Sequence, residues 1–351
     1  KQALQQSRRI HFLPQYRPEN LIKIQTLLGI VPAFGKNFIS KSFIYAFVAQ
    51  RSIKSREEVE QIETALELTS AMHALAMKMS RAGMLEQEVV AAMAGLAEAH
   101  GIGASYPSIF SVDGQILHNP NHQNVMQDGD IIINDSGAQS AMHYASDITR
   151  TFPVDGKFTQ KQTEIYTVLL NAQLKAIAAV MPGVEYRDVH TLACSQIAAG
   201  LNSLGLMKGD VSESVAAGAH ALFMPHGLGH MIGLDVHDME GLGEDDVGYT
   251  DTIRRSHQFG TSHLRLARAL EPGFVVTVEP GIYFIPALID QWQAQGKFEN
   301  FIDYKKIENY RDFGGVRIED NVLVHDNGQR VLGKPIAKTV AEVEALSSQI
   351  L

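Results

Sequence analysis

Three histidines fall within the run FMPHGLGHMIGLDVHD, residues 223–238, which is otherwise rich in glycine and apolar side chains. His226 and His230 have the spacing of one helix face, as in HExxH zinc sites, but the neighbouring glycines oppose a helix and no glutamate follows His226. In an extended chain the same two side chains would also share a face. A single histidine is more often structural than a ligand. Three of them beside flexible glycines, the third being His237, favour a metal or substrate site.

Two aspartates flank a short polar connection in IIINDSGAQSAMHYASDITR, residues 131–150. The pattern predicts a hairpin that places Asp135 and Asp147 side by side, with Asp147 inside its strand. Two carboxylates in that arrangement repel one another, so a bound cation would remove a cost in stability. The alternative is that either aspartate only caps the turn at Ser136 and Gly137.

Two glutamates lie in apolar strands further along the chain. In VVTVEPGIYF the alternation of side chains places Thr277 and Glu279 on one face. In GGVRIEDNVLV it places Arg317 and Glu319 opposite the apolar face. Together with the aspartate pair, these residues would make four carboxylates that converge on an interior. Buried acids in that number require cations.

The segments YASDITRTF, HGLGHMIGLDVHD, TVEPGIYF and GGVRIEDNV resemble the signature motifs of the pita-bread metallopeptidases, the family of aminopeptidase P, prolidase, methionine aminopeptidase and creatinase. The resemblance covers Ile53 to the C-terminus and is strongest to the prolidase branch. It implies an α+β, pseudo-twofold pita-bread (creatinase/aminopeptidase) fold. Residues 1–54 would be the remnant of an N-terminal domain and linker, with most of that domain absent, and residues 55–351 would be the catalytic domain.

The resemblance also implies a dinuclear metal centre with five ligands. Asp147 and Glu319 would bridge two divalent ions, Asp135 would complete one ion, and His230 with Glu279 would complete the other. An oxygen-rich ligand set suits Mn²⁺ or Co²⁺, with Zn²⁺ as an alternative. A bridging water would lose a proton and attack the peptide carbonyl, and Glu279 would carry that proton as a catalytic residue.

The remaining histidines receive substrate roles from the same resemblance. His226 and His237 would face the substrate and contribute to catalysis, His237 by steadying the oxyanion and the new amine. His118 and His226 would shape a pocket for proline. Arg317 would pair with a carboxylate of the substrate or of a group beside the metals.

We therefore expect metal-dependent hydrolysis of the Xaa-Pro bond in dipeptides or short peptides, as in a prolidase (Xaa-Pro dipeptidase). The alternative within the family is an Xaa-Pro aminopeptidase that acts on longer peptides. A wall that recognises a dipeptide carboxylate would come from the insertion with Arg254, Arg255 and Arg265, or from a partner subunit. A metal-free hydrolase of the creatinase kind and a non-catalytic binding protein are further alternatives, and the five intact ligands argue against both.

Composition excludes other classes of protein. The net charge of −9 over 351 residues, without a basic cluster, argues against a nucleic-acid partner. A helix needs about 20 apolar residues to cross a bilayer, and no apolar run approaches that length. The first residues of the sequence do not resemble a signal peptide. We expect a cytoplasmic homodimer without membrane contact, and a segment preceding Lys1, because the chain lacks an initiating methionine. The single cysteine, Cys194, is predicted to be buried in a helix.

The elements that must position these residues follow an order of helix pair, strands, helix pair, strands. Ser55, followed by Glu57 and Glu58, predicts the N-cap of a long helix that Gly83 should stop. The other predicted helices cover residues 20–28, 86–99, 160–181 and 188–204. The predicted strands cover residues 108–112, 131–135, 144–152, 274–280 and 314–324.

Overall fold

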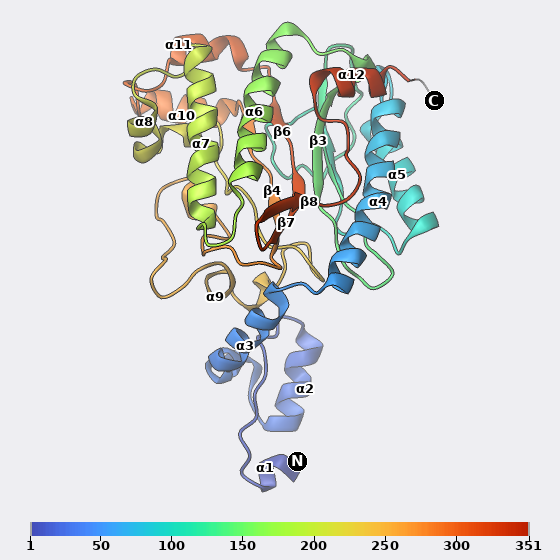
Figure 1. The fold of residues 1–351 in the computed structure, drawn as a ribbon, viewed down its shortest axis with the longest axis vertical. Coiled ribbons are helices and arrows are strands. Elements are labelled where there is room, and N and C mark those ends of the chain that lie inside the picture. The colour runs from blue at the N-terminus through green and yellow to red at the C-terminus, as the bar shows by residue number, and fades with distance from the viewer. Residues whose placement is uncertain (1, 350–351) are drawn as a thin grey trace.

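The N-terminal segment extends from one end of the computed structural model, which describes residues 2–349 (Figure 1). Its helices are α1 (Gln2–Gln5), α2 (Pro18–Leu28), the 3₁₀ helix η1 (Pro32–Phe38) and α3 (Lys41–Ser52). Beyond α3, Lys54 forms a buried ion pair of 2.9 Å with Asp238. Asp238 belongs to the histidine-rich run, and this ion pair anchors the N-terminal segment to it. The domain boundary after residue 54 stays a prediction.

The first half of the main body pairs two helices with one antiparallel sheet. The long helix α4 (Arg56–Met79) begins at Ser55 with the predicted cap, in which Ser55 and Glu58 exchange side-chain and backbone hydrogen bonds. It ends at Met79, before Gly83, which occupies the following turn at φ +89°. Helix α5 and the strands of the sheet, in the order β1-β2-β3, then follow. Their bounds are α5 (Glu86–His100), β1 (Ile109–Ser111), β2 (Ile131–Ser136) and β3 (Ile148–Pro153).

The second half repeats this order of helix pair and strands. Helices α6 and α7 lie side by side over the strands, as Figure 1 shows, with buried apolar residues between them. The strands form a sheet in the order β4-β7-β8 and a pair, β5-β6. The predicted α+β repeat is therefore confirmed. The bounds are α6 (Gln160–Ala179), α7 (Tyr186–Ser203), β4 (Val275–Val278), β5 (Gly281–Tyr283), β6 (Gly315–Arg317), β7 (Asp320–His325) and β8 (Gly328–Val331).

Short helices fill the connections and the C-terminal end. They are η2 (Val154–Gly156), α8 (Val211–Ala217), η3 (Ala219–Leu222), η4 (Glu240–Leu242), α9 (Glu244–Gly248), η5 (Thr261–His263), α10 (Pro286–Ala294), α11 (Tyr304–Ile307), η6 (Glu308–Tyr310) and α12 (Val340–Ser347). Among residues 2–349, no helix has the length and apolar character needed to cross a membrane. Cys194 is buried in α7, as predicted.

Two strand predictions are wrong in their bounds. Residues 314–324 form two strands in different sheets, because β6 pairs with β5 whereas β7 pairs with β4. Glu319 lies between these strands, where its backbone N–H donates to the carbonyl oxygen of Thr149 at 3.0 Å. Asp147 directly precedes β3 and is not inside it. Both acids therefore occupy strand ends, where a side chain can turn away from the ladder.

Candidate metal centre

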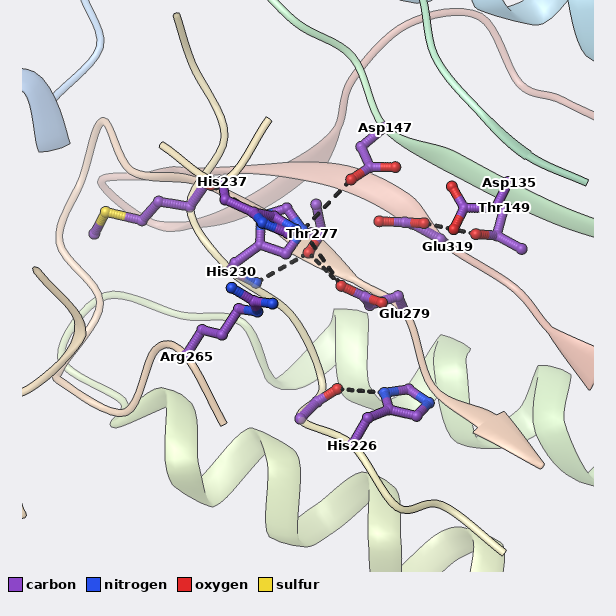
Figure 2. Close-up of polar contacts among 12 residues, drawn as sticks. Asp135, Asp147, Thr149, His226, His230, His237, Arg265, Thr277, Glu279 and Glu319 are labelled. Carbon is purple, nitrogen blue, oxygen red and sulfur yellow. Dashed lines mark hydrogen bonds and ion pairs between the residues drawn. The ribbon is translucent and has the colours of Figure 1, made fainter. Parts of the chain in front are cut away.

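Five side chains predicted to bind metal converge from five separate parts of the chain (Figure 2). The ligand atoms of three of them, which come from both halves of the fold, all lie within 4.8 Å of one another. These three are Asp147, His230 and Glu319. The other two, Asp135 in β2 and Glu279 directly after β4, border the same cavity as His230. The structure therefore brings together all five predicted ligands.

Glu319 gives the clearest sign that a cation belongs at this point. Its Oε2 accepts a 2.7 Å hydrogen bond from Thr149 Oγ1. Its buried Oε1 has no hydrogen-bond partner in the described part of the chain. Burial first, and then the negative charges of Asp147 and Glu279, raise the pKa of Glu319 well above its usual range. A buried carboxylate oxygen without a donor is costly, and a divalent cation would satisfy it.

The ring of His230 is oriented by its own backbone. Nδ1 lies 3.0 Å from the carbonyl oxygen of Met231 and donates to it, so Nε2 is left to face the acids. Nε2 lies 3.4 Å from Asp147 Oδ2 and 3.4 Å from Glu279 Oε1. Burial lowers the pKa of His230, but the hydrogen bond with Asp147 and the charge of Glu279 outweigh it and raise the pKa to about 9. A metal ion bound at Nε2 would replace this ring proton between the carboxylates.

The two aspartates do not face one another directly across the hairpin, and that prediction of register is wrong. Asp135 pairs with Thr149 across the strands, so Asp147 is offset by two residues. The side chains still meet, because the hydroxyl of Tyr106 contacts Oδ1 of both. A hydroxyl has one proton and satisfies only one of these acceptors. Among the four acids, Arg317 makes a direct contact with Asp135, of 2.7 Å from Nη2 to Oδ2.

Burial keeps three of the four acids more basic than ordinary carboxyl groups. It raises the pKa of Asp135 to about 6 although Arg317 opposes it, and it raises the pKa of Glu279 to about 7 although the charge of His230 opposes it. Burial acts in the same direction on Asp147, but the hydrogen bond and charge of His230 outweigh it and lower its pKa. Cation binding must therefore displace protons near neutral pH.

Glu279 is a predicted ligand that also faces solvent, with a side chain 20% exposed. Thr277 and Glu279 share one face of the chain, as predicted, and Thr277 Oγ1 donates to Glu279 Oε1 at 3.2 Å. The same hydroxyl accepts a 3.0 Å hydrogen bond from the backbone of His230. One threonine thus sets the positions of two predicted ligands, and it leaves the glutamate able to reach a substrate.

A cavity opens at Glu279 and brings together every residue predicted to contact substrate. Its lining includes His118, His226, His237 and Arg317. An adjoining cavity shares His118, His237 and Glu279 with the first and reaches the deeper ligands. The predicted catalytic and substrate residues therefore surround one space beside the acids.

His226 is held within this wall by two hydrogen bonds. Its Nδ1 lies 2.7 Å from the carbonyl oxygen of Gly227, and its Nε2 lies 3.1 Å from the hydroxyl of Tyr283. Arg317 Nη1 donates to that hydroxyl at 2.9 Å. Burial, followed by the charge of Arg317, lowers the pKa of His226 to about 3. The ring is therefore neutral and has both nitrogens occupied, which suits a rigid wall.

Three residues that contact predicted site residues were not predicted from the sequence: Thr149 and Tyr106, which bond predicted metal ligands, and Tyr283, which bonds His226 and Arg317. Thr149 and Tyr283 follow predicted ligands by two and four residues, so the alternation along an extended chain was a signal for both. Tyr106 lies in the irregular segment between α5 and β1, where nothing in the sequence indicates a contact with the two aspartates. Arg254, named in the sequence as a possible wall residue, is exposed and outside the lining of both cavities.

Comparisons with known proteins place the chain beside proline-directed peptidases. Residues 60–326 match the family described as metallopeptidase family M24. An Xaa-Pro dipeptidase of Mus musculus is 37% identical over 305 residues, which cover 84% of this chain and 60% of that protein. An Xaa-Pro aminopeptidase of Escherichia coli K12 is 36% identical over 301 residues, which cover 84% of this chain and 59% of that protein. The chain thus spans about 60% of the length of these relatives.

Solved structures give the same result for the fold. Aminopeptidase P from E. coli with the inhibitor Pro-Leu has a TM-score of 0.72 at 35% identity, covering 87% of this chain and 62% of that chain. A zinc-substituted E. coli aminopeptidase P in complex with product has a TM-score of 0.76 at 30% identity, covering 96% and 70%. The predicted pita-bread fold is confirmed.

The two neighbouring histidines should differ in their effect on metal content. The His237 ring lies 4.4 Å from the His230 ring, but its side chain is 45% exposed, whereas that of His230 is buried. We expect His230→Ala to lose bound metal, and His237→Ala to keep the metal content of the unchanged protein. Elemental analysis of both dialysed variants measures this. Equal losses in the two variants would show that the assignment is wrong.

Removal of metal should make stability fall as the pH rises from about 6.5 to 9. In this range Glu279, with a pKa raised to about 7, and Glu319, with a pKa raised well above its usual range, lose the stability that they confer while protonated, and the stability conferred by the raised pKa of His230 is lost as the pH rises through about 9. Both effects have the same sign. Melting temperatures of chelated and Mn²⁺-loaded protein across this range should diverge as pH increases. A constant difference between the two would contradict the prediction.

Proposed function

We propose that this chain, which belongs to metallopeptidase family M24, hydrolyses the peptide bond between any residue and a following proline. The observation that carries the proposal is the unpartnered Oε1 of Glu319 among three further acids and one imidazole, beside a cavity lined by histidines. The names of the relatives, Xaa-Pro dipeptidase and Xaa-Pro aminopeptidase, support proline specificity. A homodimer and a cytoplasmic location stay predictions from the sequence.

The donor set fits two divalent cations. Asp135, Asp147, His230, Glu279 and Glu319 would hold these ions. Four carboxylates and one imidazole favour Mn²⁺ or Co²⁺ over an ion that prefers thiolate, with Zn²⁺ as the alternative. When bound, the ions would polarise the scissile carbonyl and make water more acidic.

Glu279 would move the proton in this reaction. Its carboxylate would accept a proton from water and give it to the leaving nitrogen of proline. Its partial exposure to the cavity places it at the substrate side of the acids. His237, also at the cavity, would donate a hydrogen bond to the carbonyl oxygen as negative charge develops there.

The cavity wall at His226 would favour proline because it offers no hydrogen-bond acceptor for a peptide N–H group. Proline forms a tertiary amide without an N–H group, so its nitrogen needs no acceptor. His226 offers none, because both of its ring nitrogens are already bonded to Gly227 and Tyr283. An ordinary peptide N–H against this ring would stay unpaired, which costs about 1–3 kcal/mol.

Two arginines that line the cavity favour dipeptidase activity over aminopeptidase activity. Arg255 and Arg265 both line it, and a free carboxylate after proline would require such charge. Arg255 is paired with Glu244 at 2.9 Å and with Asp245 at 2.8 Å. Arg265 pairs with Glu240 and lies 3.4 Å from Glu244. An Xaa-Pro aminopeptidase remains the second candidate, since a curated relative of that name is as similar as the dipeptidases.

Substitution of Glu279 tests the proposed activity. Glu279→Gln keeps the shape of the side chain but removes the proton acceptor, so kcat on Ala-Pro should fall by about 10² or more, with a much smaller change in KM. The comparison substrate is Ala-Ala, which wild-type protein should cleave far more slowly than Ala-Pro. A variant nearly as fast as wild type would refute the role of Glu279. Equal cleavage of Ala-Ala and Ala-Pro would refute proline specificity.

Substitution of Arg265 tests recognition of the dipeptide carboxylate. A lost charge-assisted hydrogen bond of about 1.5–3 kcal/mol should lower kcat/KM of Arg265→Ala on Ala-Pro by about ten- to a hundredfold. The rate on the amide Ala-Pro-NH₂ should change little. Arg254→Ala is the matched control, because Arg254 is exposed and does not line the cavity. Faster cleavage of Ala-Pro-Ala than of Ala-Pro by wild type would favour the aminopeptidase.

A further inference from the structure

A second group of metal-binding side chains lies in the core of the second half. His190 and Cys194 are one turn apart on α7, and His220 lies on η3, which packs against that helix. One ligand atom from each of the three lies within 4.8 Å of the others. Each residue is at most 2% exposed. None of them lines the two cavities at the acids, so this cluster is separate from the candidate metal centre.

His220 has no hydrogen-bond partner at either ring nitrogen within the described residues. Its neighbours in sequence, Ala219, Ala221 and Leu222, are buried apolar residues of the same core. A buried imidazole normally pairs at least one nitrogen, because the loss of water must be compensated. The backbone of Val215 is close enough to raise the pKa of His220, but it makes no well-formed hydrogen bond with either ring nitrogen. The ring therefore lies beside a thiol and a second imidazole without a well-formed hydrogen bond.

The spacing of Cys194 and His190, whose side chains form a hydrogen bond, is also compatible with coordination of one ion. Cys194 Sγ lies 3.6 Å from His190 Nε2. For an ion with a metal–sulfur bond of about 2.3 Å and a metal–nitrogen bond of about 2.0–2.1 Å at a tetrahedral angle, the two ligand atoms are separated by about 3.6 Å. Residues at positions i and i+4 of a helix, as here, provide adjacent ligands on one face.

The protonation states of the three groups are also suitable. Burial lowers the pKa of His190 to about 3 and that of His220 to about 4, so both rings are neutral and keep a lone pair for a metal. Burial raises the pKa of the Cys194 thiol to about 12, so the sulfur is protonated in the absence of a cation. Binding would form a metal–sulfur bond and release the thiol proton to solvent, without any change of oxidation state.

We propose that His190, Cys194 and His220 bind one thiophilic closed-shell cation, Zn²⁺ or Cu⁺, at a site separate from the proposed peptidase centre. Thiolate and imidazole donors select these ions, whereas oxygen-rich sets select harder ones. The site would join α7 to η3, and η3 ends four residues before His226. It is a structural site, and it does not depend on the proposed peptidase activity.

Cobalt provides a specific probe, because Cys194 is the only cysteine of the chain. The full chain is produced in medium with Co²⁺ as the supplied divalent ion, so that buried sites are filled during folding. We expect a thiolate-to-cobalt charge-transfer absorption in the near ultraviolet, which carboxylates and imidazoles do not produce. Its absence in protein whose acidic centre contains Co²⁺ would overturn the proposal for Zn²⁺, and elemental analysis after growth with copper then decides it for Cu⁺.

Variants then test the individual ligands. Cys194→Ala and His220→Ala should lose the thiolate absorption and one ion per chain, while Ser195→Ala, a neighbour on α7 whose hydroxyl bonds the backbone of Thr191, should keep both. His230→Ala should also keep the thiolate absorption, because its effect is confined to the acidic centre. Retention of the absorption in His220→Ala would remove His220 from the site and refute the proposal.

Elemental analysis distinguishes the two cations. Wild type and Cys194→Ala are each purified from medium supplemented with zinc or with copper. One additional ion per chain in wild type identifies the cation that the site accepts. Equal metal contents of wild type and Cys194→Ala in both media would contradict the proposal, whatever the activity toward Xaa-Pro peptides.

Discussion

The protein buries four carboxylates close together, and the residues around them are arranged to accommodate that negative charge. Four carboxylates approach one imidazole, and nearby positive charge is scarce. Of the four acids, Arg317 directly contacts Asp135, and the single hydroxyl proton of Tyr106 is shared between two aspartates. The surrounding residues therefore bond the outer oxygens, as Thr149 bonds Oε2 of Glu319, and leave inner oxygens such as Oε1 for cations.

The frame that holds these acids is a set of hydrogen bonds between the two halves of the fold. The backbone N–H of Asp147 donates to Asn321 Oδ1 at 3.2 Å, and Asn321 Nδ2 donates to the carbonyl oxygen of Asp147 at 2.6 Å. The backbone of Glu319 donates to Thr149, and Arg150 Nη1 donates to the carbonyl oxygen of Glu319 at 2.6 Å. Each half contributes ligands, so the seam between the halves sets their spacing.

The sequence is informative where local chemistry decides structure. Ser55 and its acids specify a helix start, and alternation along the chain puts Thr277 and Glu279 on one face, because caps and strand periodicity depend on near neighbours. Tertiary pairing is different. The offset of Asp147, the break in the chain at Glu319 and the approach of Tyr106 are set by which strands and loops meet, and nothing local encodes those contacts. The convergence of the five predicted ligands followed from motif resemblance, which carries tertiary information that periodicity lacks.

The histidines show that environment, more than density in the sequence, determines the role of an imidazole. His230 and His226 belong to the same run, yet the charges of neighbouring acids raise the pKa of the first to about 9, while burial lowers that of the second to about 3. His237, in the same run, is exposed at the cavity. His190 and His220 are isolated in the sequence, and the fold brings them to one thiol in an apolar core. A buried polar atom without a well-formed hydrogen bond is therefore more informative about ligands than a cluster of histidines in the sequence. Oε1 of Glu319 is such an atom at the acidic centre, and the ring nitrogens of His220 are such atoms in the apolar core.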